Sequence, residues 1–284
     1  MNNDIQSHYA RGNLLQRLNA ALASDGADPS RPTAEALAPY DHFHGRGLQA
    51  TEDAAALVQP APTDHLLDVG SGLGGPARYF AARFGCRVSG IDLTEEFCDV
   101  ARHLARLLRQ ENCVDFHAGD ALAMPFPVDC FHGAFSMNVS MNIADKAAFY
   151  RELYRVLRPG GWLLLSELAE GSGAALDYPT PWAASADASF LATPQQTEQG
   201  LRDAGFELQQ LHDTADKARA YGAASRAAVA RGEKPPHRAV MLVHGQLATR
   251  IMANSAKALA DGRVLPIEVL ARKPAPQQPQ DAKL

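Results

Sequence analysis

The stretch LLDVGSGLGGPARYF, residues 66–80, runs from an apolar segment through a cluster of glycines into a helical pattern. Four glycines stand in the six positions from 70 to 75. Glycine is unfavourable inside a strand or a helix, so the cluster predicts a sharp turn at which the backbone comes close to a ligand. Gly70, Gly72 and Gly75 fit the pattern G-x-G-x-x-G between a strand and a helix, and Pro76 suits the first turn of that helix.

The charge of Asp68 decides which ligand this turn favours. The glycine pattern alone suggests a nicotinamide dinucleotide, whose diphosphate lies at such a turn. Asp68 ends the strand two residues before the first glycine, and its carboxylate would repel a diphosphate there. The same carboxylate would attract a cation such as the α-ammonium of S-adenosylmethionine. We therefore predict S-adenosylmethionine as the cofactor, bound by Asp68, Gly70, Gly72 and Gly74.

Acids after the next two strands support an adenosyl ligand. Asp92, in GIDLT, is predicted to take both ribose hydroxyls, and Asp120, in AGDALAMPF, is predicted to accept from the adenine amino group. Their neighbours Leu93 and Ala121 belong to the same predicted site. Any one of these acids alone is more simply explained as a helix cap or turn residue. Together with Asp68 they define one nucleoside-shaped crevice at successive strand ends.

Short apolar runs alternate with helical patterns along the chain, and this rhythm predicts βαβ units around a mostly parallel sheet. We expect helix starts at Thr51, at Thr94 and at Thr193, where Gln196 completes a capping box. The expected organisation is an N-terminal helical cap (1–50), a cofactor-binding domain (51–272) with a helical insertion at about 214–263, and a disordered tail (273–284). The seven predicted strands are HLLDVG, CRVSGID, VDFHAGD, FHGAFSM, GWLLLSEL, FELQQLHD and LPIEVLAR.

Composition narrows the class of function. The chain has 284 residues, 46% of them hydrophobic, and a formal charge of −5. Without a long Lys/Arg cluster, nucleic acid is not an expected partner, and without a long apolar run neither is a membrane. We expect a cytoplasmic protein with a small-molecule substrate, and the sequence leaves the oligomeric state open.

The combination of LLDVGSGLGG, GIDLT, GDALAMPFP and LYRVLRPGGWLLLSE resembles the core of class I S-adenosylmethionine-dependent methyltransferases. HGRGLQATEDAAAL and NVSMNIADKAAFYRELYRVLRPGG further resemble bacterial sarcosine/dimethylglycine-type N-methyltransferases. The resemblance implies a Rossmann-like α/β fold with a seven-stranded sheet whose single reversed strand is LPIEVLAR. It also implies methyl transfer to a small molecule.

Methyl transfer from a sulfonium is an in-line displacement, so the protein mainly aligns the reactants and helps with protons. In the cap segment YDHFHGRG we predict Tyr40 and His44 as catalytic residues, with Arg46 and His44 in contact with substrate. His42 is better explained as a residue that satisfies its own loop. A metal at His42 and His44 with Asp41 would lack recognisable further ligands, so no metal is predicted.

The fourth strand end and the segment after the fifth strand supply the other candidates. Asn138 is predicted to lie beside the methionine part of the cofactor and near the methyl group, in both a catalytic and a cofactor-binding role. Met141 and Trp182 are predicted to contact the substrate, although packing explains both equally well. The expected acceptor is an amine nitrogen of a carboxylate-bearing metabolite. Methylation of oxygen, carbon or sulfur, an NAD-dependent oxidoreductase and a non-catalytic adenosyl-binding protein are the alternatives.

Overall fold

A seven-stranded sheet forms the centre of the computed structural model, which describes residues 8–9 and 12–276. The strands are β1 His65–Val69, β2 Arg87–Asp92, β3 Val114–Ala118, β4 Phe131–Met137, β5 Leu157–Glu170, β6 Glu207–Asp213 and β7 Val264–Arg272. Their order across the sheet is β3-β2-β1-β4-β5-β7-β6. β1 to β5 pair in parallel, and β7 is antiparallel to both β5 and β6. All seven predicted strands are therefore present, with LPIEVLAR as the reversed one.

Helices fill the connections between the strands and extend beyond them. They are α2 Leu14–Ser24, α3 Ala34–Asp41, α4 Leu48–Leu57, α5 Gly75–Phe84, α6 Glu95–Leu107, α7 Lys146–Val156, α8 Pro194–Asp203, α9 Ala215–Ala230, α10 Ala239–His244 and α11 Ala248–Ala260. Short 3-10 turns occur at Ser140–Asn142, Ala186–Ala188 and Gly245–Leu247. Most of the region 214–263 is helical, in α9, α10 and α11.

Both faces of the sheet are buried. The helices α4, α5 and α6 cover one face, where Leu66 and Phe135 belong to the apolar core. The helices α7 and α8 cover the other, where Leu67 packs with Leu153 and Leu201. Consecutive side chains of a strand point to opposite faces, so burial on both sides explains why the parallel strands are continuous apolar runs.

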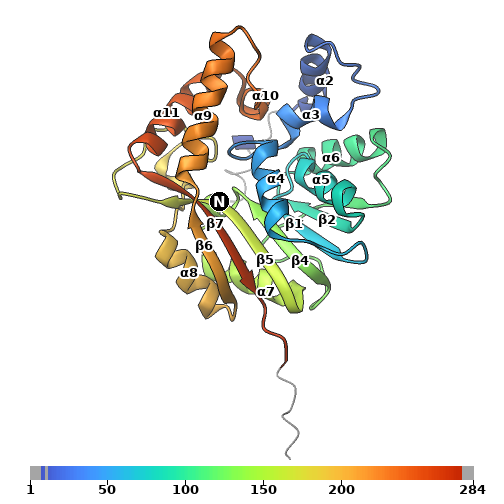
Figure 1. Cartoon of the computed structure of the whole chain (residues 1–284), viewed down its shortest axis with the longest axis vertical. Helices are drawn as coiled ribbons and strands as arrows, with labels where there is room; N and C mark the ends of the chain where they lie inside the picture. Colours follow the sequence, from blue (N-terminus) through green and yellow to red (C-terminus); the bar gives the residue numbers. More distant parts are fainter. Residues whose placement is uncertain (1–7, 10–11, 277–284) are drawn as a thin grey trace, which may run out of the picture.

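The remaining helices lie together beyond the carboxyl ends of the parallel strands (Figure 1). The cap helices α2 and α3 pack against α10, because Leu18, Leu37 and Leu242 belong to one buried cluster. Phe97 and Leu104 of α6 join the same cluster from below. The cap and the 214–263 helices therefore form one layer beyond the carboxyl ends of the strands, although they come from opposite ends of the sequence.

The predicted helix starts have different outcomes. Thr193 caps α8 and forms the capping box with Gln196, as predicted. Thr94 precedes α6 as predicted, although its side chain makes no capping hydrogen bond. The predicted start at Thr51 is wrong, since α4 begins at Leu48 and Thr51 is fully buried within it. Its hydroxyl contacts two histidine rings of the cap loop.

The prediction of a disordered tail is wrong at its first residue. Lys273 is buried, and its Nζ donates to Asp129 Oδ1 (2.6 Å) and to the carbonyls of Tyr154 and Leu157 (both 2.8 Å). The ammonium also lies 4.5 Å from the centre of the Tyr154 ring. These contacts fasten the end of β7 to the α7–β5 connection. The last part of the predicted tail, residues 277–284, lies outside the described residues.

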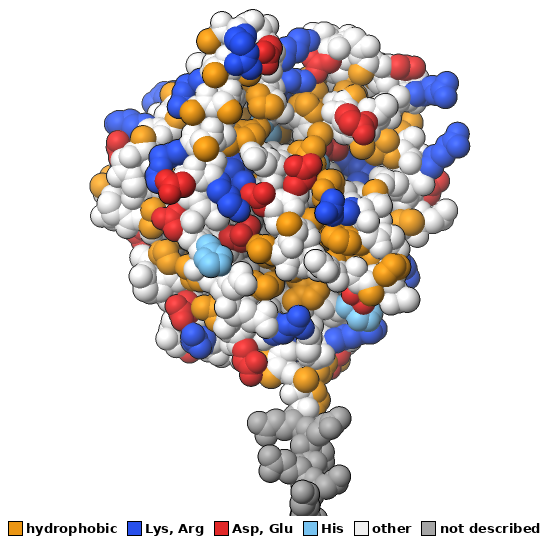
Figure 2. Space-filling view, viewed as in Figure 1, with side chains coloured by type: hydrophobic (Ala, Val, Ile, Leu, Met, Phe, Trp, Pro, Cys, Tyr) orange, Lys and Arg blue, Asp and Glu red, His pale blue; other side chains and the backbone are white. Residues whose placement is uncertain are grey.

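Acidic and basic side chains are interspersed on the face of the molecule shown in Figure 2, with small apolar patches between them. That face therefore presents no broad field of one charge. Within the described part of the chain, no helix has the length and apolar character needed to cross a bilayer.

Replacing Lys273 with alanine should lower the free energy of unfolding by about 1–3 kcal/mol, because buried carbonyls lose a charged donor. Lys257→Ala is the matched control: Lys257 pairs with Asp177, but its side chain is 62% exposed, and such exposed pairs contribute only about 0–1 kcal/mol. Urea denaturation followed by circular dichroism measures both losses. Equal losses in the two variants would contradict the anchoring role of Lys273.

Candidate active site

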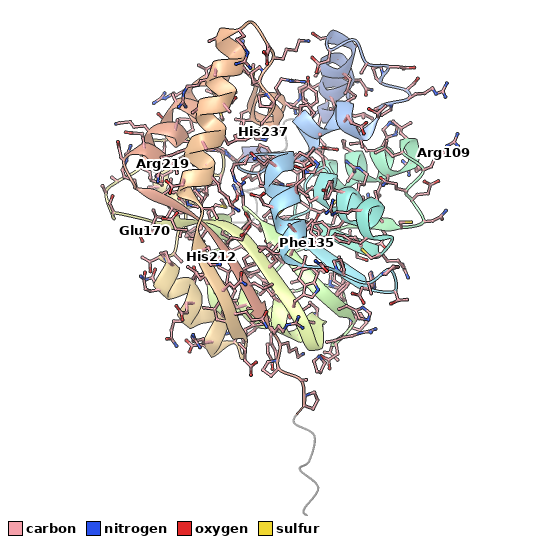
Figure 3. All side chains as sticks on the ribbon, in the orientation of Figure 1. Arg109, Phe135, Glu170, His212, Arg219 and His237 are labelled. Atoms are coloured by element: carbon pink, nitrogen blue, oxygen red, sulfur yellow. The ribbon has the colours of Figure 1, made fainter. Side chains whose placement is uncertain are left out.

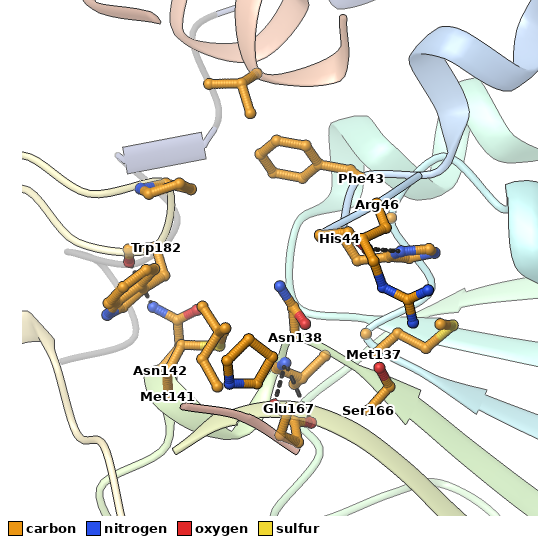
Figure 4. A pocket seen from close by; sticks show the side chains of 18 of the residues that line it. Phe43, His44, Arg46, Met137, Asn138, Met141, Asn142, Ser166, Glu167 and Trp182 are labelled. Atoms are coloured by element: carbon orange, nitrogen blue, oxygen red, sulfur yellow. Dashed lines mark hydrogen bonds between the residues drawn. The ribbon is translucent and has the colours of Figure 1, made fainter. Parts of the chain in front are cut away.

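A cavity of about 730 Å³ opens above the carboxyl ends of β1, β2, β4 and β5. Its floor is made by residues at these strand ends, and its walls come from the cap loop, the segment around Trp182, and the helices α9 and α11. Figure 4 shows the part around Asn138, with His44 and Arg46 on one side and Trp182 on the other. Cap residues and strand ends that are far apart in the sequence thus meet at one site.

The glycine turn follows β1 and borders the cavity. Gly70, Gly72 and Gly74 have φ values of +75°, +53° and +75°, a region that side-chain-bearing residues rarely adopt. Gly70 and Gly72 line the cavity, as expected for cofactor contact, but Gly74 does not. A Cβ on Gly74 would lie 2.9 Å from Arg78 Nη1 and would collide with the Phe116 ring. Gly74 therefore permits close packing behind the turn, and its contact with the cofactor stays a prediction.

Asp68 lies in the cavity floor at the end of β1 with only 2% of its surface exposed. Its Oδ2 has no hydrogen-bond partner among the described residues. Burial, and secondarily the negative charge of Asp92, raises the pKa of Asp68 well above its usual value. A buried carboxylate oxygen without a partner is unfavourable, and a cationic group bound in the cavity would relieve it. This arrangement fits the predicted ammonium contact.

Asp92 also lines the cavity, but the turn itself already holds its carboxylate. Oδ2 accepts from the Gly72 N–H (2.9 Å) and Oδ1 from the Thr94 N–H (2.8 Å). Burial raises the pKa of Asp92, and these two N–H groups partly oppose the shift. Each carboxylate oxygen has a second lone pair, so Asp92 retains the capacity to accept from ribose hydroxyls.

The other predicted cofactor residues also line the cavity, namely Leu93, Asp120, Ala121 and Asn138. Asp120 Oδ1 accepts from the Leu122 N–H at 2.9 Å, which fixes the loop after β3. Asn138 has a left-handed φ of +58°, and its N–H donates to the Ser166 carbonyl at 2.8 Å. Its carboxamide fits between the Gly45 N–H and the Ser166 carbonyl, each 3.2 Å away. Asn138 thus joins the strand-end floor to the cap loop.

The predicted catalytic pair of the cap is separated by the structure. His44 lines the cavity, whereas Tyr40 is not among its lining residues. The Tyr40 hydroxyl donates to Asp25 Oδ2 at 2.7 Å, and the Arg238 guanidinium lies 4.7 Å from the centre of the ring. Tyr40 is therefore a packing residue of the cap, and the catalytic prediction for it is corrected.

Arg46 lines the cavity as predicted, but a carboxylate of the protein already engages its guanidinium. Nη1 donates to Asp53 Oδ2 at 2.6 Å, and Lys217 Nζ lies 3.2 Å from the same oxygen. This pairing leaves little reason to assign Arg46 to a substrate carboxylate.

Met141 and Trp182 both line the cavity. They also pack with each other in a buried cluster. The Trp182 carbonyl accepts from Asn142 Nδ2 at 2.6 Å, which links the segment after β5 to the turn after β4. Packing and a substrate contact are therefore compatible for these two side chains.

Sequence reasoning missed Glu167, a buried carboxylate near the end of β5 that lines the cavity. Its Oε2 accepts from the N–H groups of Val139 and Ser140, both at 3.0 Å. Burial raises the pKa of Glu167 to about 7, against the effect of these hydrogen bonds. The only signal in the sequence was an acid within an otherwise apolar run.

His237 was also missed. It lies in the connection between α9 and α10, on the side that faces the cap (Figure 3), and it lines the cavity. Its Nε2 is 3.0 Å from the His42 carbonyl. Burial lowers the pKa of His237 to about 4. No arrangement of three or more His, Cys, Asp or Glu side chains suited to a metal ion occurs among the described residues.

The comparisons with known proteins agree with this geometry. Residues 67–165 match the family described as "Methyltransferase domain". The chain is similar to phosphoethanolamine N-methyltransferase 3 of Arabidopsis thaliana, with 30% identity over 179 residues that cover 60% of this chain and 34% of the relative. Residues 67–165 therefore carry a methyltransferase domain.

Solved structures show the same fold as this methyltransferase domain and its cap. A geranyl diphosphate methyltransferase in complex with geranyl diphosphate and sinefungin aligns with a TM-score of 0.69 at 19% identity, over 96% of this chain and 98% of that one. A putative sarcosine dimethylglycine methyltransferase from Galdieria sulphuraria aligns with a TM-score of 0.64 at 15% identity, over 80% and 86%. The chain spans 25% to 58% of the length of the first three curated relatives.

Asp68→Asn should weaken the binding of S-adenosylhomocysteine about 10- to 150-fold, because a charge-assisted hydrogen bond worth roughly 1.5–3 kcal/mol is lost. Binding to the wild type should release protons, since the ligand's ammonium favours the ionised form of Asp68, whose pKa burial raises. Calorimetry in buffers of different ionisation enthalpy measures both effects. Asp99→Asn, on the exposed side of α6, is the control. Unchanged affinity in Asp68→Asn would count against the ammonium contact.

Proposed function

We propose that the chain transfers the methyl group of S-adenosylmethionine to an amine nitrogen of a small molecule with an apolar body. The observation that carries the cofactor part is the buried Asp68 oxygen without a partner, beside the glycine turn. A diphosphate in its place would add a second negative charge to a poorly solvated carboxylate, which disfavours a nicotinamide dinucleotide.

The cavity continues well past the cofactor-binding floor, which supports an enzyme with a second ligand. Beyond Asn138 its lining includes many apolar side chains, which come from the cap loop, the turn after β4, the segment around Trp182 and the helices α10 and α11. These are Phe43, Met141, Trp182, Val240, Met252 and Leu259. Such a lining suits an acceptor with an apolar body and excludes water from the transfer.

The polar groups closest to Asn138 favour an acceptor that carries N–H. The Glu167 carboxylate, whose oxygens only accept hydrogen bonds when it is ionised, lines this part of the cavity. The His44 ring lines it too, but its nitrogens lie against the Gly45 carbonyl and the Thr51 hydroxyl, and the Arg46 guanidinium is paired with Asp53. Acceptor groups suit an amine that must be held and must lose a proton. They give a carbon nucleophile no comparable hydrogen bond.

A carboxylate on the acceptor would meet the rim formed by α9. Arg219 and Arg226 both line the cavity and stand seven positions apart, which places them on one side of the helix. Arg219 also pairs with the exposed Asp216. We assign to these two guanidiniums the contact with a substrate carboxylate that the sequence suggested for Arg46. A planar guanidinium can bind both oxygens of a carboxylate.

The test is methyl transfer from labelled S-adenosylmethionine to matched pairs of compounds. Each pair contains an apolar-bodied amine and the corresponding alcohol, with and without a carboxylate, and mass spectrometry identifies the product. We expect methylation of amines, a higher kcat/KM for the carboxylate-bearing ones, and loss of that preference in Arg226→Gln. Glu198→Gln, on exposed α8, is the control.

Each other outcome has a defined meaning. Methylation of alcohols alone would overturn the assignment to nitrogen. Binding of NADH in place of S-adenosylhomocysteine would overturn the cofactor assignment. Binding of S-adenosylhomocysteine without any methylated product would favour a non-catalytic adenosyl-binding protein.

A further inference from the structure

The segment between β5 and α8, residues 171–193, forms the wall of the cavity that carries Pro181 and Trp182. The segment is mostly irregular, with a 3-10 turn at Ala186–Ala188. Long irregular segments in a compact domain are usually functional when they are not linkers, and many of them are binding loops. The position of this wall depends on individual contacts with neighbouring elements.

Lys146 makes three of these contacts with its side-chain ammonium. Nζ donates to the carbonyls of Ser140 (2.7 Å), Ile143 (2.6 Å) and Phe190 (2.5 Å). An ammonium has three N–H donors, so this set of acceptors uses all of them. Ser140 and Ile143 belong to the turn after β4, whereas Phe190 belongs to the segment 171–193. Lys146 therefore joins the turn to the wall.

The place of Lys146 in the fold is unfavourable for a cation apart from these carbonyls. Lys146 is the first residue of α7, and the partial positive charge of a helix N-terminus disfavours an ammonium there. Burial lowers the pKa of Lys146 to about 8, although the negative charge of Glu167 opposes the shift. The side chain is thus still mostly protonated at neutral pH, and the three carbonyls are what compensates its charge.

The turn after β4 is held between two opposite charges. The Glu167 carboxylate accepts from the N–H groups of Val139 and Ser140, both at 3.0 Å. The Lys146 ammonium binds the carbonyl of the same Ser140. Glu167 thus fastens the turn to the sheet, and Lys146 fastens the segment 171–193 to the turn.

The outer side of the segment is poorly supported near Phe190. A second cavity, of about 600 Å³, is lined there by residues 189–192 and by Lys146. Few protein atoms pack against residues that border a cavity, so they gain little dispersion energy on that side. Hydrogen bonds therefore carry more of the attachment: the Phe190 N–H donates to the Met141 carbonyl at 2.8 Å, and its carbonyl accepts from Lys146.

The attachment at Phe190 extends to the acceptor side of the main cavity. The Trp182 indole N–H donates to Ser189 Oγ at 2.8 Å, directly beside Phe190. Asn142 Nδ2 donates to the Trp182 carbonyl at 2.6 Å. Figure 4 shows Trp182 next to Asn142 and Met141 on one side of the cavity. A shift of Phe190 away from the turn would therefore move Trp182.

We propose that Lys146 is a positioning residue that sets the width of the acceptor-binding part of the cavity, because it holds the segment 171–193 against the turn after β4. Lys146 is not among the described residues that line this cavity, so it acts through Trp182 and Met141. The kinetic part of this inference rests on the proposed function, whereas the contacts of the ammonium do not.

Those contacts can be measured in the wild type, without an acceptor. The full-length protein, labelled with nitrogen-15 in lysine, is studied by proton–nitrogen correlation at low temperature. We expect a slowly exchanging NH₃⁺ signal for Lys146, because carbonyls bind its protons. Its absence in Lys146→Met distinguishes it from the signal of the buried Lys273. A wild-type spectrum without such a signal would overturn the contacts.

Hydrogen exchange tests whether the contacts hold the segment. Lys146→Met keeps the length of the side chain but has no donor, so the Phe190 amide should exchange about tenfold faster or more. The Ser172 amide, which donates to the Gly262 carbonyl at the other end of the segment, should exchange as in the wild type. Lys146→Gln keeps two N–H donors on a shorter stem and should show a smaller acceleration. A Phe190 amide unchanged in both variants would overturn the attachment.

Turnover of the best amine from the labelled-methyl assay tests the effect on the acceptor. In Lys146→Met the KM for the amine should rise about tenfold or more, because the wall is misplaced, and the affinity for S-adenosylhomocysteine should be unchanged. A mere loss of folded enzyme would lower kcat and leave KM as it is. Lys257→Met is the matched control, since Lys257 pairs with Asp177 of the same segment at an exposed position, and its KM should equal that of the wild type.

The two parts of the inference fail in distinguishable ways. A wild-type KM in Lys146→Met would overturn the positioning role and leave the proposed function standing. Absence of any methylated product in the wild type would overturn the proposed function, and with it the effect on the acceptor, while the ammonium signal and the exchange of the Phe190 amide would still decide whether Lys146 holds the segment.

Discussion

The buried, unpaired oxygen of Asp68 is the constraint on which the cofactor half of the structure depends. A carboxylate taken out of water without full hydrogen bonding is expensive, by several kcal/mol in real proteins, and the nearby charge of Asp92 makes ionisation harder still. Such a group is typical of a binding site, where a bound ligand supplies the missing hydrogen bond and opposite charge. The glycines at 70 and 72 line the cavity beside it, so an adenosyl ligand with an ammonium group meets both the space and the charge.

Asp92 and Glu167 differ from Asp68 because backbone N–H groups bind both oxygens of each carboxylate, whereas Oδ2 of Asp68 has no partner among the described residues. Asp92 fixes the glycine turn through Gly72, and Glu167 fixes the turn after β4 through Val139 and Ser140. Their carboxylates shape the loops first, and only their remaining lone pairs are left for a ligand. Removing either would change loop geometry together with binding, whereas Asp68 is the acid whose replacement reports mainly on the charge of the ligand.

The features that could be predicted from the sequence are those set by interactions between residues close together in the chain. The glycine turn, the strand ends and the capping box of α8 are set by neighbours in the chain, and the structure has them where the patterns indicated. Tyr40 was misassigned because α3 continues to Asp41, so Tyr40 faces the cap interior while His44, beyond the helix end, faces the cavity. Glu167 had only a weak local signal, an acid within an apolar run, because the N–H groups that bind it follow another strand.

The acceptor half of the site is harder to predict for the same reason. Its walls are joined across the length of the chain: Arg17 Nη1 donates to the Leu242 carbonyl at 2.7 Å, the Arg238 N–H donates to the Pro39 carbonyl at 2.7 Å, and Asp25 binds both Tyr40 and Arg238. The cap and α10 therefore pack as one unit over the cavity. The floor below them is formed by strand ends whose positions are set by neighbours in the chain. A substitution in either segment alters the space offered to the acceptor, and one in the cap loop also reaches the strand-end floor, because Asn138 joins the two.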